Sequence, residues 1–195
     1  MKPAARNIYA PDGAAPDRFA PVRLTSPGRK PGAAGDYPRI ISVNLSAAKG
    51  ERKRPAASAQ LKRGHGLVGD GHAGARRRQV SLLAWESIEK MRQKGLDVGA
   101  GDFAENVTTS GIDLVSLPVG TRLRLGPAEV EVTQIGKRCH DRCEIFRQAG
   151  DCVMPREGIF AAVLQGGRIA PGDRIDADLG ANGPGLAGSD RENAR

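Results

Sequence analysis

Residues 121–133 read Thr121-Arg122-Leu123-Arg124-Leu125-Gly126-Pro127-Ala128-Glu129-Val130-Glu131-Val132-Thr133. Apolar and charged residues alternate on both sides of the Gly-Pro pair, which is the period-two pattern of a strand with one buried face. Glycine tolerates unusual backbone dihedrals and proline restricts them, so the pair favours a turn at the centre. The stretch therefore predicts an antiparallel hairpin and makes β structure the starting point for the whole chain.

Other elements are expected on both sides of this hairpin. Short apolar runs bounded by turn residues predict strands at 39–45, 79–83, 160–164 and 173–175. The i, i+3 spacing of apolar residues predicts an amphipathic helix over 85–91 that stops at Gly95, and one or two helical turns are expected at 144–148. Residues 51–60 have the composition of an exposed loop. Many short strands and turns predict a mainly β fold with a few short helices, arranged as a closed or nearly closed β-barrel.

The composition of the 195-residue chain suits one domain with extended ends. We expect a Pro/Ala/Gly-rich arm at 1–37, a β domain at 38–178 and a flexible, Gly-rich tail at 179–195. Three cysteines cannot form a complete set of disulfides, and no segment has the layout of a signal peptide. Since no apolar stretch approaches the ~20 residues that cross a bilayer, we expect a cytoplasmic protein without a membrane partner.

The formal net charge of +8 narrows the class of partner. Bases dominate residues 49–63, where Glu51 is the single acid, and Arg76-Arg77-Arg78 follows. No aromatic residues alternate with these bases as a stacking platform for single-stranded nucleic acid requires, so nucleic acid is disfavoured. A solvated basic face and a site for a phosphate-bearing or other anionic small ligand both remain open.

Two of the three cysteines, Cys139 and Cys143, lie in the stretch Gly136-Lys137-Arg138-Cys139-His140-Asp141-Arg142-Cys143. Neighbouring positive charge lowers the pKa of a thiol and raises its reactive thiolate fraction. The alternative is that a cysteine in a small protein serves only as a small apolar residue. The local charge favours a reactive role for at least one of the two.

Four segments together resemble the MOSC family, which is named for the C-terminal domain of molybdenum cofactor sulfurase. They are 64–74, with five glycines in Gly64-His65-Gly66-Leu67-Val68-Gly69-Asp70-Gly71-His72-Ala73-Gly74, then 101–109, the cysteine stretch, and 154–160. The resemblance spans residues 40–175, and it extends to the turn at 117–120, the strand end at 163–167 and the closing segment at 171–173. It implies a β-barrel domain that binds molybdenum cofactor, or that handles sulfur for metal–sulfur centres through one cysteine.

The resemblance also implies the site residues. It places the reactive cysteine after the strand that follows the hairpin, which makes Cys139 the first candidate for catalysis and for molybdenum ligation, and Cys143 the second. The commoner family pattern, a proline close before a single cysteine, is absent here. The candidates for binding the cofactor and its phosphate are His65, Asp70, His72, Arg76, Arg77, Arg78, Glu105, Asn106, Lys137, Arg138 and Arg156.

Some of these residues also have a purely structural interpretation. Glu105 and Asn106 suit local hydrogen bonds in turns as well as they suit ligand contacts, and Cys152 suits a structural role. A structural zinc ion on Cys139, His140, Cys143 and Cys152 is the main rival for the cysteines. It is disfavoured because adjacent Cys139 and His140 point in different directions and because no Cys-x-x-Cys pair occurs.

The leading hypothesis is a domain that binds molybdenum cofactor (molybdopterin), or that carries persulfide sulfur on Cys139 or Cys143. As a sulfur carrier it would need a donor such as a cysteine desulfurase, because the chain contains no pyridoxal-phosphate site of the kind found in the eukaryotic sulfurase. The alternatives are a small molybdenum-dependent oxidoreductase acting on N-hydroxylated compounds and a non-catalytic binding module. Whether the domain is an enzyme, and its oligomeric state, are left open by the sequence.

Overall fold

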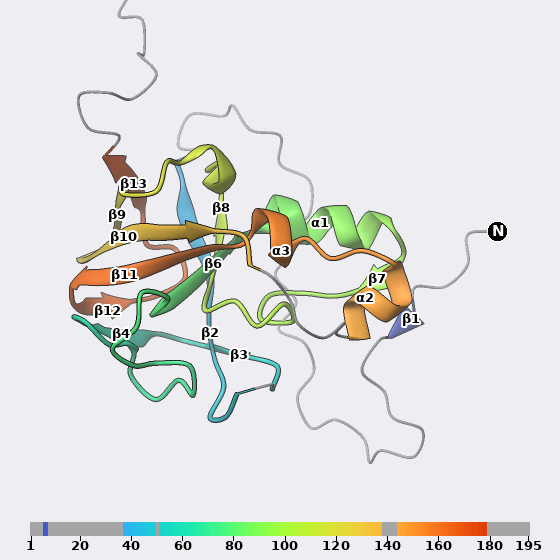
Figure 1. Ribbon diagram of the computed structural model, residues 1–195, viewed down its shortest axis with the longest axis horizontal. Helices are drawn as coiled ribbons and strands as arrows, with labels where there is room; N and C mark the ends of the chain where they lie inside the picture. The colour runs from blue at the N-terminus through green and yellow to red at the C-terminus, as the bar shows by residue number, and fades with distance from the viewer. Residues whose placement is uncertain (1–5, 8–36, 50, 138–143, 179–195) are drawn as a thin grey trace, which may run out of the picture.

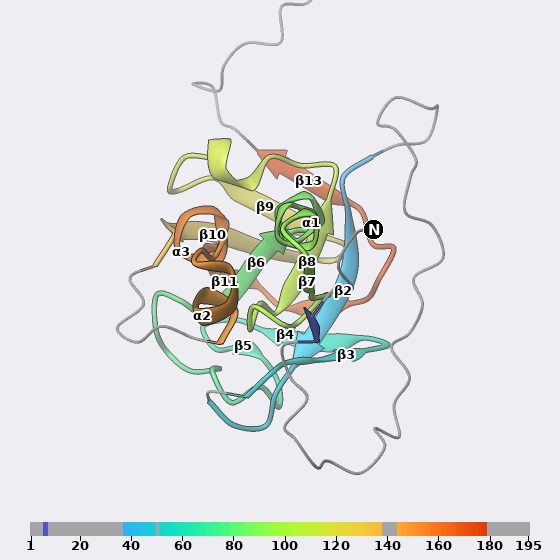
Figure 2. The same cartoon turned by 90° about the vertical axis from the view of Figure 1, so that its right-hand side faces the viewer.

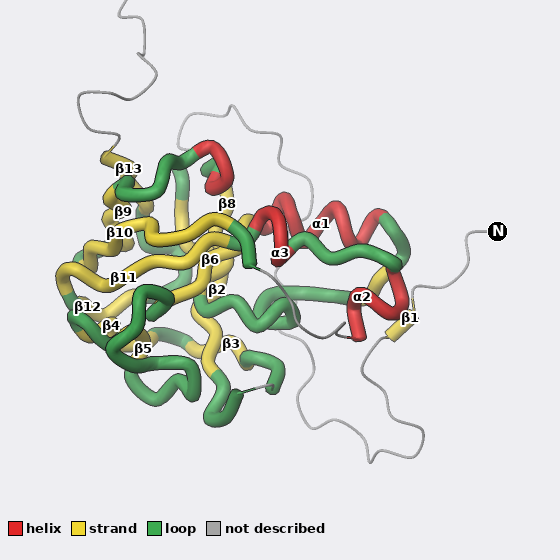
Figure 3. Tube along the Cα trace, viewed as in Figure 1, coloured by secondary structure: helices red, strands yellow, loops and turns green. Residues whose placement is uncertain are grey.

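The computed structural model of the protein describes residues 6–7, 37–49, 51–137 and 144–178 (Figure 1). The predicted tail at 179–195 and nearly all of the predicted arm at 1–37 lie outside these residues. The described part is mainly β with three short helices (Figure 3). In chain order its elements are β1 (Arg6–Asn7), β2 (Arg39–Leu45), β3 (Arg54–Ala56), β4 (Ala59–Lys62), β5 (Gly66–Leu67), β6 (Val80–Ala84), α1 (Trp85–Gln93), β7 (Leu96–Asp97), β8 (Val107–Ser110), the 3-10 turn η1 (Leu114–Ser116), β9 (Arg122–Leu125), β10 (Ala128–Ile135), α2 (Glu144–Ala149), α3 (Met154–Glu157), β11 (Ile159–Gln165), β12 (Gly167–Ile169) and β13 (Ile175–Asp178).

The main sheet has eight strands in the order β13-β9-β10-β11-β6-β8-β2-β3. The predicted hairpin is confirmed as β9 and β10, with Leu125 opposite Ala128. Pairing is parallel between β6 and β8 and antiparallel elsewhere in this sheet. The described residues also form a three-stranded sheet, β12-β4-β5, and the parallel pair β1-β7.

The barrel prediction is not supported, since no sheet closes on itself within the described residues. The contact that comes closest to closing the main sheet is an isolated antiparallel bridge between Arg39, at the start of β2, and Arg174, just before β13. The Ile40 amide also donates to the Asp173 carbonyl at 2.9 Å. Beyond β2 the sheet continues into the three-residue strand β3, where it ends. Pro55 in β3 has no backbone N–H, and such residues are typical of sheet edges rather than of closed sheets.

Two apolar clusters hold the fold together. The larger one fills the interior between strands, with members such as Leu61, Leu82 and Leu123 fully buried. The smaller one lies where α1, α2 and α3 gather beside the strands (Figures 1 and 2). It contains Ile88 and Met91 of α1, which confirms the predicted amphipathic helix. No helix among the described residues is long and apolar enough to span a membrane.

The prediction of an exposed loop at 51–60 is wrong. This stretch contains β3 and the start of β4, and the Lys53 side chain is buried. Strand β8 was also not predicted, because both of its faces are covered and its sequence therefore shows no apolar–polar alternation. In contrast, the strands expected at 39–45, 79–83 and 160–164 and the helical turns at 144–148 are confirmed by β2, β6, β11 and α2.

Candidate functional site

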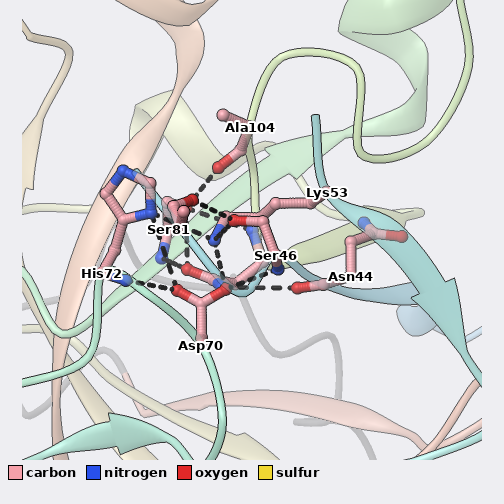
Figure 4. A network of polar contacts seen from close by, with 9 residues as sticks. Asn44, Ser46, Lys53, Asp70, His72, Ser81 and Ala104 are labelled. Carbon is pink, nitrogen blue, oxygen red and sulfur yellow. Dashed lines mark hydrogen bonds and ion pairs between the residues drawn. The ribbon is translucent and has the colours of Figure 1, made fainter. Parts of the chain in front are cut away.

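The Gly-rich segment 64–74 carries Asp70 and His72 to the buried end of Lys53 (Figure 4). The Asp70 carboxylate forms an ion pair with the Lys53 ammonium group. It also accepts the backbone N–H of Ser46 at 3.1 Å and that of His72 at 3.0 Å. Burial by itself raises the pKa of Asp70, but the hydrogen bonds from Lys53 and the two amides outweigh it and hold that pKa below its usual value.

Lys53 was not predicted as a site residue, yet it is central to this cluster. Its side chain is 1% exposed, and that of Asp70 is 2% exposed. Besides Asp70, its ammonium group lies 3.4 Å from Nδ1 of His72 and 3.5 Å from Oγ of Ser46. In the sequence Lys53 stands between Arg52 and Arg54, both exposed, so no local signal distinguishes it from its neighbours.

His72 is the member of the cluster that reaches solvent, with a side chain that is 40% exposed. Its pKa is lowered by partial burial and then by the charge of Lys53, against the opposing effect of Asp70. Lys49 and Lys137 lower the pKa further, so both lie within electrostatic range of the imidazole. Lys49 and Lys137 therefore add to the positive charge that acts on His72.

Glu105 and Asn106 are fully or almost fully buried and are satisfied by groups of the protein. The Glu105 carboxyl accepts the Gly101 amide at 2.5 Å, the Phe103 amide at 3.2 Å and the Thr108 hydroxyl at 2.8 Å. Burial raises the pKa of Glu105 to about 7, although the hydrogen bonds from Gly101 and Thr108 oppose the rise. This geometry suits the local structural role of Glu105 that the sequence had left open.

Asn106, the residue after Glu105, forms hydrogen bonds that connect three strands. Its side-chain carbonyl accepts the Ser81 amide at 3.2 Å and the Ser81 hydroxyl at 3.1 Å. Its side-chain amide donates to the Asn44 carbonyl at 3.3 Å. Asn106 therefore links β6 and β2 at the start of β8, which supports the loops that carry the site.

The loop at 99–105 also fixes the backbone next to Lys53. The Lys53 amide donates to the Gly101 carbonyl at 3.2 Å, and Nε of Arg52 donates to Asp102 at 2.6 Å. Gly101 has a φ of +88°, and a Cβ at this position would lie 2.2 Å from the Lys53 carbonyl oxygen. The close approach therefore requires glycine.

The predicted arginines lie in two different parts of the structure. Arg76, Arg77 and Arg78 are exposed and lie beside β10 and β11, since Thr133 donates to the Arg77 carbonyl at 2.6 Å and the Arg78 guanidinium lies 5.4 Å from the centre of the Phe160 ring. Arg156 is exposed and paired with Asp151 at 2.8 Å.

His65, the other predicted histidine of the Gly-rich segment, is half-buried. Its backbone carbonyl oxygen accepts the Gly74 amide at 2.7 Å.

The predicted reactive thiols, Cys139 and Cys143, and the predicted anion ligand Arg138 lie outside the described residues. The residues just before them are firmly anchored. The Gly136 amide donates to the Gly158 carbonyl at 2.7 Å, and the Lys137 amide donates to the Pro155 carbonyl at 3.1 Å. The cysteine stretch therefore begins against the 154–160 segment and within electrostatic range of His72.

Cys152 lies apart from this stretch in the smaller apolar cluster and is 6% exposed. Within the described ranges no group of three or more His, Cys, Asp or Glu side chains is placed to hold a metal ion.

The fold and the site together define a small, mainly β domain with a cation-rich polar site built on loops. The family model described as MOSC domain matches residues 69–176, more than half of the chain, and the chain belongs to the MOSC domain family. This family is associated with molybdenum cofactor binding. The comparison with curated proteins gives no match.

Solved structures show the same fold at low sequence identity. The YuaD protein from Bacillus subtilis is 19% identical, with a TM-score of 0.61 over 73% of this chain and 96% of that one. YiiM from Geobacillus stearothermophilus is 23% identical, with a TM-score of 0.56 over 72% of this chain and 75% of that one.

Proposed function

We propose that this domain binds molybdenum cofactor, with Cys139 as the first candidate for the molybdenum ligand and Cys143 as the second. The observation that carries the proposal is the electrostatic effect of Lys137 on His72. This residue lies two positions before Cys139 and acts electrostatically on His72, together with Lys49 and Lys53. Lys137 is thus the described residue that connects the cation-rich site to the thiol stretch along the chain.

The side chains present fit the chemistry of such a ligand. The pterin part of the cofactor carries a phosphate, which ammonium and guanidinium groups bind well. His72, Lys49 and Lys137 are the described residues that would hold the anionic part, with Arg76, Arg77 and Arg78 as further donors. A thiolate is a soft ligand suited to a molybdenum–sulfur bond. When bound, the cofactor would supply a metal centre for redox or atom-transfer chemistry.

The buried residues of the predicted set take another role in this proposal. Asp70, Glu105 and Asn106 already use their polar atoms within the protein. We therefore assign them to positioning the loops, while the exposed and half-exposed cations contact the ligand. Arg156, engaged with Asp151, is a weaker candidate than the Arg76–Arg78 run.

Sulfur carriage on the same thiol is the closely related form of the proposal. A cysteine persulfide also depends on a thiolate favoured by neighbouring positive charge, and it would require a sulfur donor such as a cysteine desulfurase. Reduction of N-hydroxylated compounds would require the bound cofactor, so cofactor capture is tested first.

The test is mass spectrometry with metal analysis of the protein after mixing with molybdenum cofactor, and separately with a desulfurase and cysteine. Wild type is compared with Cys139→Ser and Cys143→Ser, and Cys152→Ser is the matched control because that thiol is buried elsewhere. Loss of captured molybdenum or of the sulfur adduct in Cys139→Ser alone supports the proposal, and loss in Cys143→Ser alone moves the role to Cys143. If wild type captures neither species, or if all variants retain them, the thiol mechanism is wrong.

A further inference from the structure

We propose that His72 is an oxyanion ligand that acts as a neutral hydrogen-bond donor through Nε2–H, and that Lys53 is the positioning residue that holds it in this tautomer. The proposal deepens the function above and rests on it only for the identity of the natural ligand.

The tautomer follows from the contacts of Lys53. An ammonium group has three N–H donors and no acceptor. The three polar atoms around Nζ are a carboxylate oxygen of Asp70, Oγ of Ser46 at 3.5 Å and Nδ1 of His72 at 3.4 Å. Since Nζ only donates, Nδ1 must accept, and the proton of a neutral imidazole then resides on Nε2.

The alternative tautomer has no good partner here. A proton on Nδ1 would have to point to Oδ1 of Asp70, which lies 3.7 Å away, too far for a hydrogen bond. That oxygen already accepts the backbone N–H of His72 at 3.0 Å. A proton on Nδ1 would also face the donors of Lys53. The contacts therefore favour Nε2–H, and Figure 4 shows the other ring nitrogen of His72 turned away from Lys53.

The backbone fixes the direction of the imidazole as well. The Gly71 amide donates to the Ser46 carbonyl at 2.7 Å, and a Cβ on Gly71 would lie 2.7 Å from the Ala47 carbonyl oxygen. This close approach clamps the loop onto the chain segment that follows β2. Since the neighbouring amide of His72 is held by Asp70, the side chain projects from a fixed backbone.

The charges around His72 identify the class of ligand. The groups that act on the imidazole are Lys53, Asp70, Lys49 and Lys137. Lys53 and Asp70 neutralise each other, which leaves Lys49 and Lys137 as the remaining positive charges that act on the partly exposed imidazole. Two cations and a directed donor suit a tetrahedral oxyanion, either a phosphate group or an oxometalate.

The first experiment determines the tautomer by nitrogen NMR of the full chain labelled with 15N-histidine. The chain has three histidines, and the His72→Gln variant assigns the His72 signals by their disappearance. At neutral pH we expect Nδ1 to give the signal of an unprotonated nitrogen and Nε2 that of a protonated one. Protonation at Nδ1, or at both nitrogens, overturns the proposal.

Variants of the partner test the positioning role. Lys53→Met removes the donor to Nδ1 and should allow the two tautomers to mix. Asp70→Asn is the second variant, because it keeps Lys53 and the donor to Nδ1 and should leave the Nε2–H tautomer in place. If Lys53→Met does not fold, the Asp70→Asn spectrum still decides, since a change of tautomer there shows that Asp70 rather than Lys53 sets it.

The second experiment measures binding of inorganic molybdate and inorganic phosphate to the protein without cofactor, by calorimetry at constant chloride. We expect His72→Ala to weaken binding about tenfold, equivalent to about 1.4 kcal/mol, and His72→Gln to retain most of it through its side-chain amide. Lys49→Ala should also weaken binding. Arg122→Ala serves as the control, because it removes one exposed charge on β9 that pairs with Glu129 of β10.

The two probes separate the sources of the oxyanion. Binding of both supports a general tetrahedral oxyanion site, and binding of one alone assigns the site to that chemistry. If neither binds, or if His72→Ala and Arg122→Ala bind equally well, the proposal is overturned.

The pH dependence of molybdate binding provides an independent check. A neutral donor should give an affinity that is nearly constant between about pH 6 and pH 8, whereas an imidazolium ligand would lose affinity as pH rises through this range. A steep loss overturns the proposal. Oxyanion binding without cofactor capture would leave this inference standing and refute the proposed function, and cofactor capture with the wrong tautomer would do the opposite.

Discussion

Lys53 and Asp70 form an ion pair in which both side chains are buried. Removal of one partner leaves the other charge in a poorly solvated site, which typically costs about 3–5 kcal/mol. We therefore predict that Lys53→Met lowers the free energy of unfolding by several kcal/mol, measured by urea denaturation at neutral pH.

A matched lysine provides the control for this prediction. Lys90 pairs with Glu157 at 2.9 Å but is 59% exposed, and exposed pairs contribute only about 0–1 kcal/mol. Lys90→Met should therefore cost far less than Lys53→Met. Equal costs would show that the Lys53–Asp70 pair is well hydrated in solution.

Glu105 is a buried carboxyl whose pKa burial raises to about 7, from 4.5 in its ordinary state. The folded protein thus holds this proton more tightly than the unfolded chain. The stabilisation that results from this tighter proton binding is fully present below about pH 4.5 and is lost as the pH rises to about 7. The loss amounts to up to about 3 kcal/mol.

Glu105→Gln tests this pH dependence. The variant cannot ionise, so its unfolding free energy should fall less steeply than that of wild type between pH 5 and pH 7, roughly the interval set by these two pKa values. At pH 5 it should be less stable than wild type, because a side-chain amide NH₂ cannot accept the hydrogen bonds of Gly101 and Phe103 in the same way. Parallel pH profiles for the two proteins would contradict the raised pKa.

At the scale of elements, Gly136 joins β10 to the cysteine stretch with a φ of +67°. A Cβ at this position would lie 2.3 Å from the Pro155 carbonyl oxygen, so backbone must move to accommodate it. We predict that Gly136→Ala destabilises the fold by more than about 1 kcal/mol, the usual cost of a left-handed conformation alone. It should also weaken cofactor capture, because it displaces the start of the cysteine stretch.

Gly95, after α1, is the control for this substitution. It has a φ of +91°, and nothing lies within 4 Å of the point that an alanine Cβ would occupy, so Gly95→Ala incurs the conformational cost without the clash. Thermal denaturation of both variants separates the two effects. A larger loss in Gly95→Ala would refute the importance of the contact with Pro155.

The order of strands makes a prediction for the whole molecule. β10 and β11 have a strand on each side, whereas β3 ends the main sheet and has two exposed residues. We predict that the amides of β10 and β11 exchange with deuterium most slowly and that those near β3 exchange fastest, measured by mass spectrometry of peptides. Equal protection of β3 would indicate that another segment covers this edge in solution.

Local patterns determined the parts of the protein that depend on near neighbours in the chain. Alternation predicted the hairpin of β9 and β10, and i, i+3 spacing predicted α1, because these periods reflect a single buried face. Motif order led to the MOSC family and placed Asp70 and His72 in one Gly-rich loop. Strand β8 escaped prediction since both of its faces are covered.

Tertiary structure alone decided which side chains meet. Arg52, Lys53 and Arg54 are equivalent as a local sequence, but the pairing of β3 with β2 and the contact of Lys53 with Gly101 turn only Lys53 inward. In the same way, the open sheet replaced the expected barrel because the order of strands depends on contacts between distant segments. The sequence by itself thus determined the family, the elements with clear periodicity and the candidate loops, whereas burial and charge partners depended on long-range packing that no local pattern encodes.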